Sequence, residues 1–220
     1  MAVGLVGELV APSRCAACEE GVGYSTLFCP ACGVSVMGAD EQPPGQLSVF
    51  SYGGAIAAAI VRFKYAGRWD LAARFEGMMS DAAKGLAGRV DVVVPVPLHA
   101  RRLADRGFDQ AALLAQPVAR ALPARYAPRA LSRLRHTPPQ ASLDREERVA
   151  NVAEAFVCVA PSAILGRHVL LVDDVRTTGA TLAACAGVLR QAGARQVTTL
   201  VLASRDREKN VDKAAKSAHS

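Results

Sequence analysis

The stretch VLLVDDVRTTGATL, residues 169–182, decides both the fold class and the candidate site. An apolar run ends at two adjacent carboxylates, Asp173 and Asp174, and a threonine-rich turn leads into an apolar pattern with helical spacing. A buried strand that passes through a short turn into a helix is typical of α/β proteins with a parallel sheet. In such sheets ligands bind beyond the carboxyl ends of the strands, which is where we expect the two acids.

The rest of the chain repeats this alternation of strands and helices. Apolar and β-branched runs predict strands over 47–52, 89–97, 129–134, 168–174 and 196–204. Helical spacing predicts helices over 53–67, 69–86, 109–122 and 180–194. This order indicates an α/β fold, in which helices flank a parallel sheet on both faces.

Three segments carry more specific expectations. Residues 99–108 are predicted to form a basic loop, and Pro117 to kink its helix or shift the start of that helix. Residues 135–156 begin as a loop and are expected to become a helix after Ser142 or Asp144. The charged residues from Arg205 onward are expected to fray.

The acid pair and the turn after it suggest a phosphorylated sugar as ligand. Asp173 and Asp174 are expected to face solvent, where they can accept hydrogen bonds from a vicinal diol or lie beside a hydrated magnesium ion. The threonines of Thr177–Thr181 donate hydroxyl hydrogens, Gly179 lets the backbone approach an anion, and the first amides of the next helix bind phosphate. The alternative is that one acid or one threonine caps the helix, which leaves the other residues unexplained.

Four cysteines form two pairs near the start of the chain, Cys15 with Cys18 and Cys29 with Cys32. The spacing is typical of a treble-cleft or ribbon-type zinc site, in which four thiolates surround the metal. Two disulfides or a redox pair are the alternatives, and reducing cytosol disfavours both. Because all four ligands come from the protein, the zinc would be structural and would supply the folding energy of this short module.

Other residues near these motifs have expected structural roles. Gly33 is predicted to take a left-handed turn after the second cysteine pair. Cys158 and Cys185 lie within apolar patterns and are expected to pack in the core.

The composition bounds the class of protein. The chain has 220 residues, 51% of them hydrophobic, and a net charge of +6, which suits one domain of moderate size with a small appendage. We expect no membrane span, because no stretch of about 20 uninterrupted apolar residues occurs. The start, MAVGLVGELVAP, lacks the basic region of a signal peptide, so a cytoplasmic location is expected. The positive balance suits phosphates or nucleic acid, and equally a soluble surface with a modest charge bias.

An arginine cluster predicts where a nucleic acid would bind. Its members are Arg120, Arg125, Arg129, Arg133, Arg135, Arg145 and Arg148. Basic residues in a flexible region neutralise phosphates with little sequence specificity. Asp144, Glu146 and Glu147 dilute the cluster, and an arginine-rich composition is the alternative explanation.

Residues 169–182 resemble the phosphoribosyl-diphosphate (PRPP) motif of type I phosphoribosyltransferases, a hydrophobic strand followed by DD and TTGAT. The segments VVVPVPLHARRLADRGFDQAALLA and RHTPPQASLDREERVANVAEAF resemble the ComF (competence protein F, GntX-like) family, which also has the four-cysteine module. The family pattern in the second segment falls on Arg135, Thr137, Gln140, Arg148 and Asn151. One departure is Asp109, where the family often has Asn, and a carboxylate there would weaken a contact with an anion.

The resemblance implies a type I phosphoribosyltransferase-like domain that binds PRPP with Mg²⁺. Asp173 and Asp174 would be the catalytic pair that holds the ribose hydroxyls, and the 5-phosphate would lie against Val175, Arg176, Thr177, Thr178, Gly179, Ala180 and Thr181. Arg176 could reach a phosphate or point outward. The diphosphate would lie on the loop after the first core strand, against Pro95, Val96, Pro97, Leu98, His99, Arg101, Arg102 and Arg106.

The implied function is phosphoribosyl transfer to an unidentified acceptor, linked through ComF to DNA uptake in natural transformation. The alternative is a DNA-binding competence factor whose PRPP pocket is regulatory rather than catalytic. Implied partners are single-stranded or branched DNA and a competence helicase. The expected division is a zinc module with linker over 1–45, a phosphoribosyltransferase-like domain over 46–204 and a flexible charged tail over 205–220.

Overall fold

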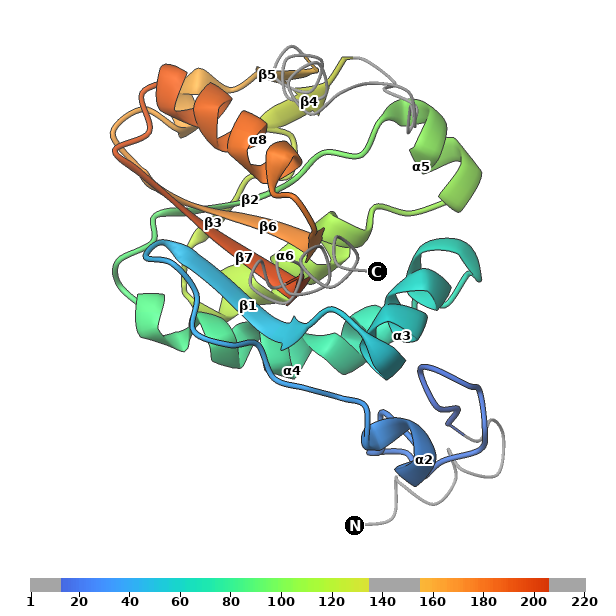
Figure 1. Cartoon of the computed structure of the whole chain (residues 1–220). Coiled ribbons are helices and arrows are strands. Elements are labelled where there is room, and N and C mark those ends of the chain that lie inside the picture. The colour runs from blue at the N-terminus through green and yellow to red at the C-terminus, as the bar shows by residue number, and fades with distance from the viewer. Residues whose placement is uncertain (1–12, 135–154, 206–220) are drawn as a thin grey trace, which may run out of the picture.

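The central feature of the computed structural model is a parallel sheet of five strands in the order β1-β7-β6-β2-β3 (Figure 1). The structure describes residues 13–134 and 155–205. The strands are β1 Gln46–Ser51, β2 Val92–Pro95, β3 Arg125–Tyr126, β6 His168–Arg176 and β7 Gln196–Ser204. Every neighbouring pair in this sheet is parallel, which confirms the predicted fold class.

Helices cover both faces of this sheet (Figure 1). One face carries α3 Gly54–Tyr65, α4 Leu71–Ala83, its 3-10 extension η1 Lys84–Leu86, and α6 Gln110–Ala121. The other carries α8 Ala180–Gln191, beside a small antiparallel pair, β4 Leu131–Arg133 and β5 Phe156–Cys158. The short elements are α2 Pro30–Gly33, α5 Ala100–Arg106 and the 3-10 turn η2 Pro161–Ala163.

The apolar run of β6 is continuous because both faces of the strand are buried. Leu170 and Val172 pack in the core under α4 and α6, whereas Val169 and Leu171 pack in the core under α8. Side chains alternate between the faces of a strand, so this parity continues into the residues that follow. Cys185 is fully buried in the α8 core and Cys158 packs against it, as predicted.

The chain reverses its direction of winding between β2 and β6. From β2 the chain passes through α6 to β3, and from β6 it passes through α8 to β7 on the opposite side. The two connections leave the same edge on opposite faces of the sheet. Such a switch point leaves a crevice at the carboxyl ends of the two strands. The turn that follows Arg176 and the loop that follows Pro95 both begin there.

Several local predictions are wrong. The expected basic loop contains α5, whose ends are fixed by His99, which accepts a hydrogen bond from the backbone N of Arg101, and by Gly107 in the left-handed conformation. The helix α6 runs without interruption through Pro117 to Ala121. Phe156 begins a strand rather than ending a helix, because β5 pairs with β4.

The strand β6 also extends beyond its predicted end to Arg176, and β3 was not anticipated. The ComF-pattern residues and the helix predicted after Ser142 or Asp144 lie outside the described residues. So do Arg145 with its neighbouring acids and the tail beyond Arg205.

Candidate functional site

The two adjacent acids point to opposite faces of the sheet, because they lie in the extended strand β6. Asp174 is on the α3 side and only 5% exposed, and its Oδ1 lies 2.8 Å from the Lys64 Nζ in the last turn of α3. The expectation that both acids face solvent is therefore wrong for Asp174. A carboxylate with this little exposure is stabilised by an opposite charge at contact distance.

Asp173 lies on the α8 side and is half-buried. Its Oδ1 accepts a hydrogen bond of 2.8 Å from the backbone N of Asp174. Burial raises the pKa of Asp173 to about 8, and the neighbouring charge of Asp174 acts in the same direction while Lys64 opposes it. The edge therefore holds one paired carboxylate and one carboxyl group that retains its proton near neutral pH.

The threonine-rich turn connects this edge to α8. Gly179 is the residue before the helix and has φ 81°, a left-handed conformation that glycine adopts without strain. Thr177 and Thr178 are exposed, and Thr178 Oγ1 accepts a hydrogen bond of 3.4 Å from the backbone N of Ala180. The first amides of a helix of this length lack partners within the helix, so the turn presents hydroxyls and amides together.

Arg176 takes neither of the two orientations expected for it. Its guanidinium donates hydrogen bonds to Gln46 Oε1, at 2.7 Å, and to Gln42 Oε1. The Cδ atom of Arg176 lies 3.7 Å from the position that a Cβ atom would take at Gly179, so this side chain packs against the turn. Arg176 therefore connects the threonine-rich turn to β1, the edge strand of the sheet.

The loop after β2 lies beside the acid edge. Pro95 pairs with Val172, and the backbone N of Val96 donates a hydrogen bond of 2.8 Å to Val172 O. Leu98 N donates a longer bond of 3.5 Å to Asp109 Oδ2. The structure thus brings the loop 95–99 next to the strand that carries Asp173.

The three arginines assigned to this loop have different environments. Arg101 is exposed and Arg102 is half-buried on α5. Arg106 turns toward α3, where it donates a hydrogen bond of 3.0 Å to the Tyr65 hydroxyl and covers the Tyr65 ring at 4.7 Å. Arg106 therefore holds α5 against α3.

Asp109 has a structural role that sequence reasoning missed. Its Oδ1 accepts a hydrogen bond of 3.0 Å from the backbone N of Ala112 and so caps α6. Burial raises its pKa, and the charge of Asp174 adds to this effect. Lys64 was also missed, because only the tertiary fold brings it to Asp174.

The predicted arginine cluster is divided between different parts of the molecule. Arg120 pairs with Glu76 of α4 at 3.5 Å. Arg125 begins β3, and Arg129 is exposed in the turn after this strand. Arg133 lies in β4 with its guanidinium 5.3 Å from the centre of the Phe156 ring.

The four cysteines of the N-terminal pairs come together as predicted. Their Sγ atoms all lie within 4.8 Å of one another, and Cys18 Sγ and Cys29 Sγ are 3.6 Å apart. Tetrahedral sulfur ligands about 2.3 Å from zinc lie about 3.8 Å apart, so this set fits such an ion. Side-chain hydrogen bonds with Cys18 and Cys29 raise the pKa of Cys32 to about 12, whereas a bound cation would favour the thiolate. The cluster could hold a metal ion.

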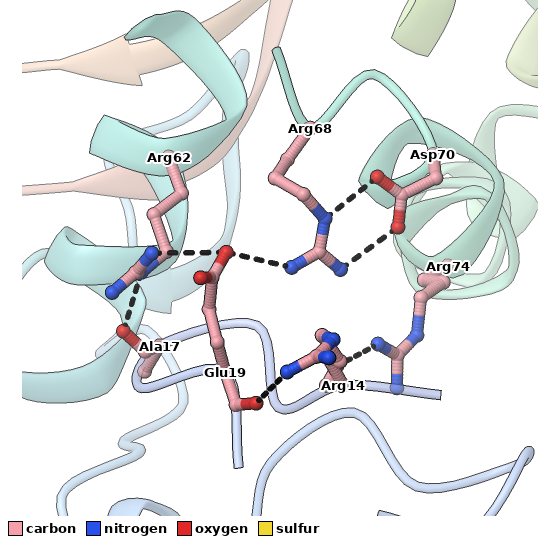
Figure 2. Close-up of polar contacts among 7 residues, drawn as sticks. All are labelled: Arg14, Ala17, Glu19, Arg62, Arg68, Asp70 and Arg74. Carbon is pink, nitrogen blue, oxygen red and sulfur yellow. Dashed lines mark hydrogen bonds and ion pairs between the residues drawn. The ribbon is translucent and has the colours of Figure 1, made fainter. Parts of the chain in front are cut away.

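The cysteine module is fixed to α3 and to the start of α4 by arginines (Figure 2). Arg62 donates a hydrogen bond of 2.7 Å to Ala17 O and pairs with Glu19 at 3.0 Å. Arg74 donates to Arg14 O at 2.7 Å. The left-handed turn predicted at Gly33 is wrong, because Gly33 lies in α2. Glu19, which follows the first cysteine pair, has a left-handed φ of 68°.

Comparison with known proteins identifies the family to which the chain belongs. Residues 73–219, more than half of the chain, match the family described as "Phosphoribosyl transferase domain". The "DNA utilization protein YhgH" of Salmonella typhimurium is 32% identical over 83% of this chain and 86% of its own length. The "Competence protein F" of Haemophilus influenzae is 36% identical over 51% of this chain and 50% of its own length. The chain belongs to the ComF-like family of phosphoribosyltransferase-fold proteins.

A second relative named for competence is the "Competence protein ComFC" of Bacillus subtilis, which is 31% identical over 66% of this chain and 58% of its own length. The suspected family is therefore confirmed. Within residues 13–134 and 155–205, no helix has the length and apolar character needed to cross a membrane.

Proposed function

We propose that this ComF-like chain binds PRPP at the carboxyl edge of β2 and β6, and that this binding serves DNA uptake. The observation that carries the proposal is the juxtaposition of the acid pair, the Thr177–Thr181 turn and the loop 95–99 at the switch point of the sheet. Relatives named for competence and DNA utilization support the connection with DNA.

Each part of the ligand meets a matching group in this arrangement. Asp173 and Asp174 would accept hydrogen bonds from the ribose hydroxyls, and the hydroxyls and amides of Thr177–Thr181 would bind the 5-phosphate. The backbone of the loop 95–99 would face the diphosphate, with Arg101 and Arg102 supplying positive charge. When bound, Mg²⁺ would neutralise diphosphate charge.

The proposed reaction is displacement at the anomeric carbon of the ribose. The acceptor forms the new bond to this carbon as the bond to the diphosphate oxygen breaks, and pyrophosphate leaves. Positive charge that develops on the ribose ring would be stabilised by the carboxylate of Asp174. The cysteine module is proposed to hold structural zinc, which would fix the position of α3 and therefore of Lys64.

Calorimetric titration with PRPP and Mg²⁺ tests the binding step. We expect wild type to bind and Asp174→Asn to lose at least about tenfold in affinity, the equivalent of one charge-assisted hydrogen bond. Lys64→Met separates two explanations of that loss, because it breaks the same ion pair but keeps the acid. Asp81→Asn, at an exposed position of α4, is the matched control and should bind as wild type does.

Loss of binding in Lys64→Met equal to that in Asp174→Asn would mean that the ion pair, rather than the carboxylate, is required. A wild-type titration without heat, in protein whose thermal unfolding is cooperative, would reject the PRPP proposal.

A further inference from the structure

The amino edge of the sheet, opposite the acid edge, carries a row of exposed arginines. Arg125 is the first residue of β3, and Arg167 and Arg195 directly precede β6 and β7. Arg89 lies in the turn before β2. All four side chains are exposed, and we call them the amino-edge arginines.

Backbone hydrogen bonds place these residues in sequence along the edge. Arg125 N donates to Asp91 O at 3.0 Å, Asp91 N donates to His168 O at 3.0 Å, and Arg195 N donates to Arg167 O at 2.8 Å. Adjacent strands are about 4.8 Å apart, so the row from β3 to β7 is about 14 Å long. One strand of nucleic acid rises about 3.4 Å per nucleotide, so several phosphates fit along this length.

A cavity of about 470 Å³ lies at the β3 end of this row. Arg125 and Arg167 line it together with Asp91, and Val90 and Leu122 contribute its apolar part. Two guanidinium groups on one cavity suit a phosphate, because their planar donors match its oxygens in pairs.

The charge of the row is only partly offset by acid. Asp91 accepts a hydrogen bond of 2.7 Å from the backbone N of His168 and lies 3.4 Å from Arg195 Nη2. In the part of the chain that the structure describes, four arginines against this one aspartate leave the edge positively charged. Arg120 and Arg190 lie nearby in the last turns of α6 and α8, where cations offset the helix dipole, so they are not counted in the row.

We propose that the amino-edge arginines bind the phosphodiester backbone of a polynucleotide, on the opposite side of the sheet from the PRPP site. The choice of a polynucleotide rests on the DNA connection in the proposed function, but the surface does not depend on the PRPP site. Contacts of this kind go to phosphates, so binding depends on salt rather than on base sequence.

Fluorescence anisotropy with a labelled oligothymidylate about 20 nucleotides long tests the surface. The double variant Arg125→Gln/Arg167→Gln removes the two arginines of the cavity. We expect its affinity to fall at least about tenfold, and the slope of log affinity against log salt to decrease by about 1.4, which is about 0.7 for each lost phosphate contact. A duplex of the same length distinguishes single-stranded from double-stranded binding, and either supports the proposal.

The matched control is Arg129→Gln/Arg205→Gln, which removes the same charge from exposed positions that follow β3 and β7, away from the row. This control should keep the wild-type slope, and both double variants should melt as wild type does. An equal loss in the control, an unchanged slope in the cavity variant, or binding of inorganic phosphate but of neither oligonucleotide would overturn the proposal. PRPP calorimetry on the cavity variant should match wild type, which separates failure of this surface from failure of the PRPP site.

Discussion

The two edges of the sheet differ in the sign and in the burial of their charges. At the carboxyl edge, Asp109 and Asp173 are half-buried and Asp174 is buried. At the amino edge, the four arginines are exposed. Between the edges, β2 and β6 are apolar on both faces, so the charged side chains of these two strands lie at or beyond their ends.

This difference in burial implies two kinds of binding site. Partly buried carboxyl groups are held in fixed positions and have shifted pKa values, as Asp173 and Asp109 do. Exposed arginines stay solvated, and salt at 0.1 M largely screens their interactions beyond about 10 Å. The carboxyl edge is therefore suited to a small ligand of fixed shape, whereas the amino edge is suited to a flexible polyanion.

Loss of the metal should give the largest difference between the two edges, because it should weaken binding at the carboxyl edge but not at the amino edge. The module is held to α3 through the bond from Arg62 to Ala17 O, and the last turn of α3 carries Lys64 to Asp174. Apparent binding free energies of structural zinc are about 10–16 kcal/mol, so Cys29→Ser should unfold the module. We expect PRPP affinity to fall at least about tenfold, while oligonucleotide affinity stays at the wild-type value.

The matched control for this experiment is Cys158→Ser, because Cys158 lies outside the module and packs against the α8 core. Elemental analysis should find one metal per wild-type chain and none in Cys29→Ser. Equal losses at both edges in Cys29→Ser would show that the module supports the whole domain rather than α3.

Asp173 should give the carboxyl edge a stability that falls as pH rises. Its pKa is raised to about 8, whereas an unfolded aspartate titrates near 4, so the folded state holds an extra proton between these values. The free energy of unfolding therefore decreases as pH rises from about 4 to about 8. Below about pH 4 Asp173 is protonated in both the folded and the unfolded state, so it adds no pH dependence there. Asp173→Asn should flatten this decrease in urea titrations across the pH range. Asp109, whose pKa is also raised, should leave a residual slope of the same sign.

Asp70→Asn provides the control for this effect. The hydrogen-bonded ion pair with Arg68 lowers the pKa of Asp70, so its contribution to stability is lost only as pH falls below about 4. Its removal should leave the slope between about pH 4 and 8 as in wild type. A wild-type slope that survives in Asp173→Asn would show that Asp173 is ionised across this window.

The sequence was sufficient for the local parts of the site but not for their orientation. The apolar run, the acid pair and the threonine turn are adjacent in the chain, so strand, turn and helix could be predicted directly. Asp173 and Asp174 point in opposite directions because β6 stays extended and paired with β7 on both sides of the acid pair, which depends on contacts with a distant strand. The cysteine spacing predicted a cluster because the ligands themselves fix its geometry.

Contacts between distant segments could not be predicted from the sequence. Lys64 is an ordinary basic residue at the end of a helix until α3 places it against Asp174. The arginine cluster was predicted from density along the chain, whereas the amino-edge row arises from strand order. Arg89, Arg167 and Arg195 were missed because each stands alone in the sequence and only the parallel sheet aligns them with Arg125.

His168 should give the amino edge a pH dependence of the opposite sign, and the smallest effect. Burial lowers its pKa, and the charge of Arg195 also acts to lower it, while the bond to Arg89 O opposes. Since Arg89 O can only accept, His168 Nδ1 donates to it at 2.9 Å, and Nε2 accepts from the Thr198 hydroxyl at 2.8 Å. The unfolded state takes up a proton first as pH falls below about 6.5, so stability is lost on acidification.

The effect is small because the Thr198 hydroxyl can rotate and accept a hydrogen bond from the protonated ring. It is best measured in an Asp173→Asn background, where the opposing slope of the carboxyl edge is removed. Addition of His168→Asn should abolish the remaining loss of stability between about pH 6.5 and 5, whereas addition of Thr198→Val should retain it, because the imidazole still titrates in its buried position. If the loss of stability between about pH 6.5 and 5 is the same with and without His168, proton uptake at His168 is not linked to folding. The amino edge would then contribute exposed charge for binding but no pH dependence of stability, and only the carboxyl edge would link protonation to folding.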